Sequence, residues 1–271
     1  MQKESKVSSL IKRHIVGALF LPVFFAYLYY LPPSPYFFAL LLIVAVIALR
    51  ELFTMYNVPA AVSASGIVTG AALLYAFCYY PEYYLESIFA ALCLLLLIRL
   101  LLIASPSGCM SHIGPVVTGY FYVAFFLSFQ WLLRFGDNGL EYIFMLYISV
   151  WLADSMAYYI GSSVGRHKLY PSVSPNKTVE GAVGSLIGGM AGVFIVKTVF
   201  HLSVISTFSA VMTGIMFGVA ALAGDLVESM LKRDAGVKDS GAFIPGHGGI
   251  LDKIDGFLVS GPVLYFMTRY F

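Results

Sequence analysis

Residues 87–104 read SIFAALCLLLLIRLLLIA, an apolar run of 18 residues that contains one charged side chain, Arg99. A helix needs about 20 apolar residues to cross the hydrocarbon core of a bilayer, so this run predicts a transmembrane helix. The whole chain is similar in character, because 60% of its 271 residues are hydrophobic, 11% are charged and the mean hydropathy is +0.87. Soluble domains carry roughly 25% charged residues. The composition therefore excludes a soluble globular protein and indicates an integral membrane protein.

Apolar runs bounded by charged residues or prolines predict an all-α polytopic membrane protein with about nine transmembrane helices. The predicted spans are 15–31, 36–49, 60–80, 87–104, 116–133, 142–160, 181–199, 204–222 and 254–271. No hydrophilic stretch is long enough for a second domain, so residues 1–271 are expected to form one integral-membrane domain. The first run lacks a small-residue cleavage site after it, which favours a retained helix over a signal peptide.

The basic residues predict an orientation. With the N-terminus in the cytoplasm, Arg134, Lys197 and Arg269 fall on the outer side, and the other 13 of the 16 lysines and arginines fall on the cytoplasmic side. This asymmetry obeys the positive-inside rule, under which cytoplasmic loops are enriched in basic residues. The few basic residues are thinly spread, so the sequence does not suggest a nucleic-acid partner.

Carboxylates are concentrated in two windows, residues 151–181 and 224–256, both of which the charge count places in the cytoplasm. These windows hold eight of the 14 acidic residues: Asp154, Glu180, Asp225, Glu228, Asp234, Asp239, Asp252 and Asp255. Ionisable groups at membrane depth are costly, and those that occur usually have a function. We therefore expect the cytoplasmic loops to form a polar site.

The first window combines a carboxylate near the end of a span with a loop suited to phosphate. Asp154 lies in the sixth predicted span, and the loop that follows contains Ser174, Lys177 and Thr178. Small hydroxyls, free backbone N–H groups and a lysine just before a helix suit an anion. Two structural alternatives exist, because Asp154 could pack against a neighbouring helix and Glu180 could simply belong to a helix start.

The second window carries polar residues at the spacing i, i+3, i+4 and i+7, namely Asp225, Glu228, Ser229 and Lys232, and a helix would place them on one stripe. The first three are oxygen donors. A solvated amphipathic face is the structural alternative. Mg²⁺ prefers carboxylate oxygens and commonly takes one or two of them together with substrate phosphates, so the stripe favours a metal site. Asp252 and Asp255 are expected to complete it. A zinc site is disfavoured, because no second His or Cys lies at ligand spacing from His247.

Both windows resemble the signature of the phosphatidate cytidylyltransferases, also called CDP-diacylglycerol synthases. The second window carries Ser229-x-x-Lys232-Arg233, Lys238-Asp239 and His247-Gly248-Gly249-x-x-Asp252-Lys253-x-Asp255. The first carries Trp151-x-x-Asp154-x-x-Ala157-Tyr158 and Ser174-Pro175-x-Lys177-Thr178-x-Glu180-Gly181. The chain departs from the family pattern at Lys253, where an arginine is usual. Lysine keeps the positive charge but cannot make the bidentate phosphate contact of arginine.

The resemblance implies that CTP and phosphatidate react to give CDP-diacylglycerol and pyrophosphate in phospholipid biosynthesis, with Mg²⁺ as cofactor and a second cation left open. It implies a multi-pass protein of the cell's inner (plasma) membrane, with a cytoplasmic active site and a homodimer left open. The implied catalytic residues are Asp225, Lys232, Arg233, His247, Asp252 and Lys253. The implied metal ligands are Asp225, Asp252, Glu228, Ser229 and Asp255. The implied substrate-binding residues are Asp154, Ser174, Lys177, Thr178, Glu180, Lys238, Asp239, Gly248 and Gly249.

Two other functions share part of this pattern. A CTP-dependent polyprenol kinase would use the same combination of metal and phosphate groups. An ion-coupled transporter would use the intramembrane Asp154 as its ion site, although no internal repeat of the kind common in transporters is visible.

Overall fold

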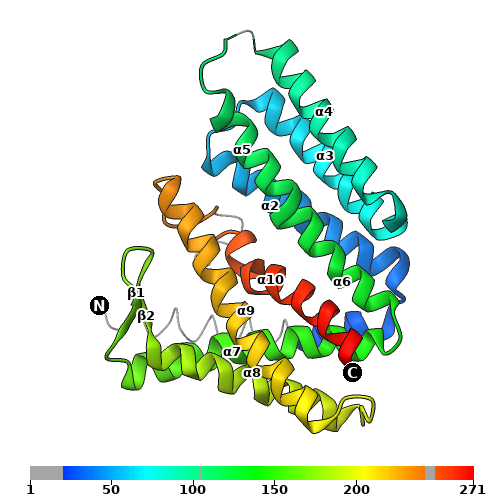
Figure 1. Cartoon of the computed structure of the whole chain (residues 1–271), viewed down its shortest axis with the longest axis vertical. Coiled ribbons are helices and arrows are strands. Elements are labelled where there is room, and N and C mark those ends of the chain that lie inside the picture. The colour runs from blue at the N-terminus through cyan, green and yellow to red at the C-terminus, as the bar shows by residue number, and fades with distance from the viewer. Residues whose placement is uncertain (1–20, 104, 242–247) are drawn as a thin grey trace.

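The computed structural model describes residues 21–103, 105–241 and 248–271, and Figure 1 shows the arrangement of the helices. A helix over Leu21–Tyr30 comes first. The α-helices that follow are α2 (Phe38–Met55), α3 (Ala60–Tyr79), α4 (Tyr84–Leu102), α5 (Cys109–Gly119), α6 (Phe126–Phe135), α7 (Gly139–Val164), α8 (Val179–Val199), α9 (Thr207–Asp234) and α10 (Leu251–Met267). Short helical turns over Pro33–Phe37, Pro81–Tyr83, Tyr120–Phe125 and Thr268–Tyr270 extend or join them. The strands are β1 (Lys168–Tyr170) and β2 (Ser174–Thr178).

Seven helical segments of the described chain are long and apolar enough to cross a membrane, which confirms the predicted polytopic helical class. They are Pro33–Met55, Ala60–Tyr79, Pro81–Leu102, Cys109–Phe135, Gly139–Val164, Val179–Val199 and Thr207–Asp234. The first predicted span lies partly outside the described residues, and its described part, Leu21–Tyr30, is short. The last corresponds to α10, which has 17 residues. These two spans of the predicted nine therefore stay predictions.

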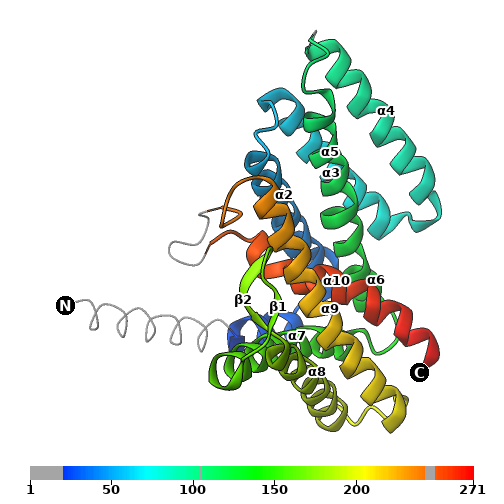
Figure 2. The ribbon, with the colours of Figure 1, turned by 60° about the vertical axis from the view of Figure 1, so that its left-hand side comes forward.

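The helices form two groups that α9 and α10 connect (Figures 1 and 2). Helices α2 to α6 form one group, while α7 and α8 pack closely against each other and form the other. The closeness of α7 and α8 depends on glycine, since a Cβ atom at Gly188 would overlap the carbonyl oxygen of Leu152. Membrane helices often pack through small residues, because these let two backbones approach and gain dispersion contacts. Helix α9 packs on α8, and α10 packs on α9 and α6.

Two local features extend the sequence-based prediction. Helix α9 continues to Asp234, about three turns beyond the predicted end of its span at residue 222, so the polar stripe is helical as expected. The loop after α7 is not irregular: β1 and β2 form an antiparallel hairpin, with Lys168 opposite Thr178 and Tyr170 opposite Ser174. The hairpin is held against α9 by Arg233, whose side chain donates to the carbonyl oxygen of Val173 at 3.3 Å.

Candidate metal and phosphate site

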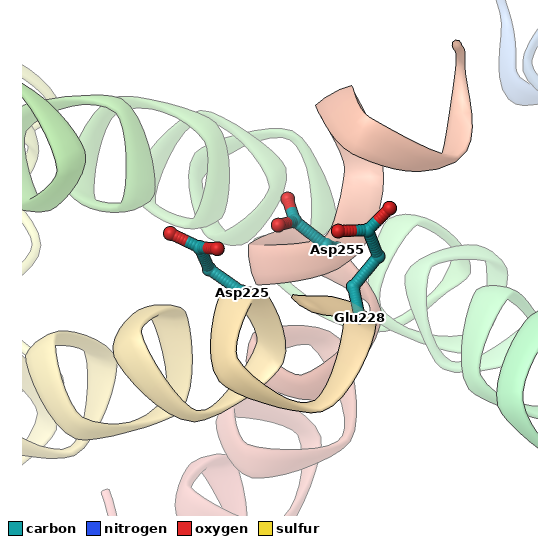
Figure 3. Close-up of side chains that lie close together, drawn as sticks. All are labelled: Asp225, Glu228 and Asp255. Carbon is teal, nitrogen blue, oxygen red and sulfur yellow. The ribbon is translucent and has the colours of Figure 1, made fainter. Parts of the chain in front are cut away.

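Three carboxylates meet where α9 and α10 approach each other, and we call them the acidic triad: Asp225, Glu228 and Asp255. One oxygen from each lies within 4.8 Å of the other two. Figure 3 shows the side chains turned toward one another, Asp225 and Glu228 from α9 and Asp255 from α10. The Glu228 residue is 1% exposed. Three oxygen donors at this separation can converge on one hard divalent cation.

Local sequence explains why the triad can form. Asp225 and Glu228 are three residues apart, so the helix places them on one face. The residue before them is Gly224, at which a Cβ atom would overlap the carbonyl oxygen of Asp255. Gly256 takes part in the same contact, because its Cα atom lies 3.0 Å from the Cβ position at Gly224. The two glycines thus let α9 and α10 approach closely enough for their carboxylates to share one site.

Two lysines are paired with carboxylates of this site. Lys177, on β2, places its Nζ atom 2.6 Å from Oδ2 of Asp225. Lys232, on α9, forms an ion pair with Glu228 and also reaches Oδ1 of Asp252 at 2.6 Å. The lysines of both predicted windows are therefore brought to the same group of carboxylates, although 55 positions separate them in the chain (232 − 177).

The site carries more negative than positive charge. Asp154 of α7 interacts electrostatically with Asp225, Asp255 and Lys177, which adds a fourth acidic group beside the triad. With Asp252, five carboxylates stand against two lysines, an excess of three negative charges when all are ionised. A partly buried carboxylate without a counter-charge is unfavourable, so this excess favours the binding of a cation.

Asp252 lies beside the triad and has partners of its own. Its Oδ2 atom accepts from the backbone N–H of Gly249 at 2.7 Å, and from the N–H and hydroxyl of Ser240 at 3.2 and 3.0 Å. Its Oδ1 atom is the one that receives Lys232. Both oxygens are thus engaged by protein donors, and the metal-ligand role predicted for Asp252 stays a prediction. Ser229 donates to Oδ1 of Asp225 at 3.2 Å, which places its hydroxyl next to the triad.

The hairpin residues of the first window have structural partners. Thr178 is the N-cap of α8, and its hydroxyl oxygen accepts from the backbone N–H of Gly181 at 3.1 Å. Glu180 accepts from the backbone N–H of Arg166 at 3.1 Å and lies 2.7 Å from Nδ1 of His167. Thr178 and Glu180 thus both lie at the start of α8, as the helix-start alternative expects, and their predicted substrate-binding roles stay predictions. Ser174 lies in β2, paired with Tyr170.

The remaining predicted residues lie at the edge of the site or outside the described residues. Arg233 is exposed and donates to the carbonyl oxygens of Val173 and Val237. Lys238 and Asp239 lie beyond the end of α9 and Lys253 lies in the first turn of α10, all three exposed. Gly248 adopts a positive φ of 84°, which favours glycine, and Gly249 is buried beside Asp252. His247 lies outside the described residues, so its predicted role stays a prediction.

Sequence reasoning missed two residues near the site. Tyr122 is buried, its hydroxyl donates to the carbonyl oxygen of Gly224 at 3.4 Å, and it is electrostatically close to the triad. Nothing in the sequence distinguishes it from the other 18 tyrosines. Glu51 is buried and bonds to the start of α10, whereas its neighbour Arg50 is exposed. The position of Glu51 inside an apolar run indicates a buried carboxylate with a specific partner. The sequence cannot show, however, which distant amides would reach it.

Comparison with known proteins agrees with this geometry. A family model described as "Cytidylyltransferase family" matches residues 11–271. The chain is 37% identical to the phosphatidate cytidylyltransferase of Bacillus subtilis (strain 168) over 183 residues, which is 67% of this chain and 68% of that protein. It is 36% identical to the phosphatidate cytidylyltransferase of Staphylococcus saprophyticus over 232 residues, 82% of this chain and 85% of that one. It is also 35% identical to the uncharacterized protein YnbB of Escherichia coli (strain K12), over 62% of this chain and 58% of that protein.

Proposed function

The chain belongs to the cytidylyltransferase family, and from that premise we propose that it transfers the cytidylyl group of CTP to phosphatidate, forming CDP-diacylglycerol and pyrophosphate. The observation that carries the proposal is the acidic triad on α9 and α10 with two lysines paired beside it, in a chain whose described part has seven helices long and apolar enough to cross a membrane. This combination suits a reaction in which a triphosphate and a lipid phosphate must be brought together despite their charges.

The residues present fit a Mg²⁺ ion. The donors of the triad are carboxylate oxygens, which hard cations prefer, and no thiolate or imidazole belongs to it. Glu228 is buried, and the positive group that the described residues bring to it is Lys232. Asp225, Glu228 and Asp255 would hold the ion, with Ser229 and Asp252 beside them. A bound Mg²⁺ would supply charge neutralisation at the phosphates, and the sequence leaves open a second cation.

The reaction depends on the positioning of the two substrates more than on a general base. The phosphate of phosphatidate is already ionised at neutral pH and is itself the nucleophile that attacks the α-phosphorus of CTP. The protein therefore has to align the two phosphates and offset their charge. Lys177 and Lys232 come from separate elements and now neutralise carboxylates, so each can exchange its carboxylate for a substrate phosphate once a cation takes its place.

Other polar residues would extend the phosphate-binding surface around the triad. Arg233, Lys238 and Lys253 are exposed cations close in sequence to Lys232 or Asp252, and Gly248 and Gly249 offer a backbone without side chains. We infer substrate contacts for these five residues and for Asp154, Ser174, Thr178, Glu180, Asp239 and His247. Thr178 and Glu180 also bond to the backbone at the start of α8 and before the hairpin, which shapes the loop that carries Lys177.

The site is proposed to face the cytoplasm. All but three of the lysines and arginines fall on that side when the N-terminus is cytoplasmic, as the positive-inside rule requires. A site at this interface of the inner (plasma) membrane meets a soluble nucleotide and a membrane-held lipid at the same place.

One assay tests the function. Purified protein is incubated with CTP labelled in the cytosine, phosphatidate and Mg²⁺, and the label that becomes lipid-soluble is counted. We expect a labelled lipid that requires all three components, with release of pyrophosphate. A dolichol-type alcohol in place of phosphatidate tests for a kinase, which would release CDP and leave the cytosine label in water. Cation uptake into liposomes without CTP tests for a transporter. Activity in either of these arms, without labelled lipid in the first, would refute the proposal.

A further inference from the structure

A buried carboxylate outside the acidic triad holds the start of α10. Glu51, near the C-terminal end of α2, is 8% exposed. Its Oε1 atom accepts from the backbone N–H of Ile250 at 3.0 Å, and its Oε2 atom accepts from that of Leu251 at 2.9 Å. These amides belong to the N-terminal end of α10, where backbone donors have no partner within the helix. The side chain therefore fixes where α10 begins, and an acidic group at this place suits the positive end of the helix dipole.

The same carboxylate also contacts the chain that leads into this turn. The hydroxyl of Ser240 lies 3.3 Å from Oε2 of Glu51, and the Cβ position of Gly241 lies 2.7 Å from Oε1. A Cβ atom at Gly249 would overlap both Oε2 of Glu51 and the Ser240 hydroxyl. Two positions that are eight residues apart (249 − 241) thus meet on one carboxylate, and a Cβ atom at either glycine would crowd the end of the Glu51 side chain.

From Glu51 a short series of contacts leads to the site. Ser240 donates to Asp252 from its N–H and from its hydroxyl, and Asp252 in turn receives Lys232. Lys232 is the ion-pair partner of Glu228 in the triad. Asp255 follows one turn after Asp252 in α10, so any displacement of the helix start would move it too.

The end of α2 also contacts the end of α9. The hydroxyl of Tyr56 donates to Oδ2 of Asp234 at 2.9 Å and lies 3.2 Å from the carbonyl oxygen of Leu231. Burial and the neighbouring Asp234 carboxylate raise the pKa of Tyr56 to about 12, so it stays a donor at neutral pH. The two helices that supply the triad are therefore both tied to α2, which itself contributes nothing to the triad.

We propose that Glu51 is a positioning residue of the transfer reaction: by fixing the start of α10 against α2, it sets the distance of Asp255 and Asp252 from the α9 stripe. The inference rests on the proposed function where it concerns the rate of transfer. Where it concerns the affinity of the triad for a cation, it rests on geometry alone. It assigns to Glu51 no contact with substrate or metal. A purely structural role, in which Glu51 only stabilises the fold, is the alternative to be distinguished.

The test compares Glu51→Gln with wild type and with the matched control Glu86→Gln, an exposed position in α4. Glutamine keeps the shape but turns a donor toward one of the two amides. We expect kcat to fall at least tenfold, the Mg²⁺ concentration for half-maximal activity to rise severalfold, and the affinity for Mn²⁺ alone, measured by electron paramagnetic resonance, to fall by a similar factor. The control should match wild type in all three.

The outcomes separate the possibilities. The positioning role would be refuted if Glu51→Gln kept the wild-type Mg²⁺ half-saturation and Mn²⁺ affinity. In that case kcat would fall only in proportion to the folded fraction of the protein. If wild type itself forms no labelled lipid, the proposed function fails, but the difference in Mn²⁺ affinity still decides the role of Glu51. If Glu51→Gln does not fold, Glu51→Asp keeps the carboxylate but shortens the side chain, so that it cannot reach both amides at the start of α10 from the same backbone position. It should weaken Mn²⁺ binding in the same direction, and unchanged binding would refute the proposal.

Discussion

Replacing Gly224 by alanine should separate α9 from α10 and disable the site without unfolding the protein. A Cβ atom there would overlap the Asp255 carbonyl oxygen, lie 2.8 Å from its carbonyl carbon and lie 3.0 Å from the Cα atom of Gly256. Carbon atoms prefer a separation of ~3.5–4 Å, so the helices must move apart by roughly 1 Å. All the atoms concerned are backbone, so no side chain can rotate away.

The expected magnitude follows from that displacement. Overpacking of a fitted contact costs about 1–3 kcal/mol, and the better helix propensity of alanine returns up to ~1 kcal/mol, so the protein should stay folded. The carboxylate of Asp255 moves with its backbone relative to Asp225 and Glu228. A misplacement of about 1 Å in a catalytic group can cost on the order of a hundredfold in rate. We therefore expect kcat/KM to fall about a hundredfold while thermal unfolding in detergent shifts by only a few degrees.

The assay measures labelled lipid at saturating phosphatidate, beside thermal unfolding of the same preparations. Gly114→Ala in α5 is the matched control, because among the described residues nothing beyond its own stretch of helix lies within 4 Å of its Cβ position. This control should keep wild-type activity. If Gly224→Ala stayed within about a factor of two of wild type, the close approach of α9 and α10 would not be what organises the site.

Three further predictions concern single residues. Asp225→Asn should abolish transfer and leave the protein folded, because the triad loses a charged ligand; near-normal rates at saturating Mg²⁺ would show that Asp225 is not a ligand. Lys253→Arg should keep most of the activity, whereas Lys253→Ala should lose on the order of a hundredfold in kcat/KM for CTP, as for one preorganised donor; an alanine variant close to wild type would mean that Lys253 only marks the membrane interface. Cys109, which begins α5, should react with membrane-impermeant thiol reagents from the cytoplasmic face only; labelling from outside intact cells would overturn the proposed orientation.

Much of the fold could be predicted because its cause is local. Each apolar run must satisfy its backbone hydrogen bonds within a helix, so hydropathy alone locates most spans. The stripe from Asp225 to Lys232 follows from helical periodicity and is confirmed by α9. The hairpin of β1 and β2 was not predicted, because its three- and five-residue strands carry no clear alternation of polar and apolar side chains.

The residues that make up the site could be predicted better than the hydrogen bonds and ion pairs between them. The sequence grouped Asp252 and Asp255 as equals, but they lie about one turn apart in α10, so Asp255 joins the triad whereas Asp252 receives Lys232 and Gly249. Spacing along one helix cannot show which residues of a neighbouring helix each side chain meets. Contacts between distant segments, such as Glu51 with Leu251, depend on packing that no local pattern encodes.

The central claim is that Asp225, Glu228 and Asp255 hold the cation used in cytidylyl transfer. Crystals grown with Mn²⁺ and a non-reactive CTP analogue test it directly, because the anomalous scattering of Mn²⁺ locates the ion without reference to activity. We predict an anomalous peak at the triad, about 2.1 Å from its carboxylate oxygens, the distance typical of octahedral oxygen sites. A peak bound to Asp252 with none at the triad, or no peak at α9 and α10, would contradict the account.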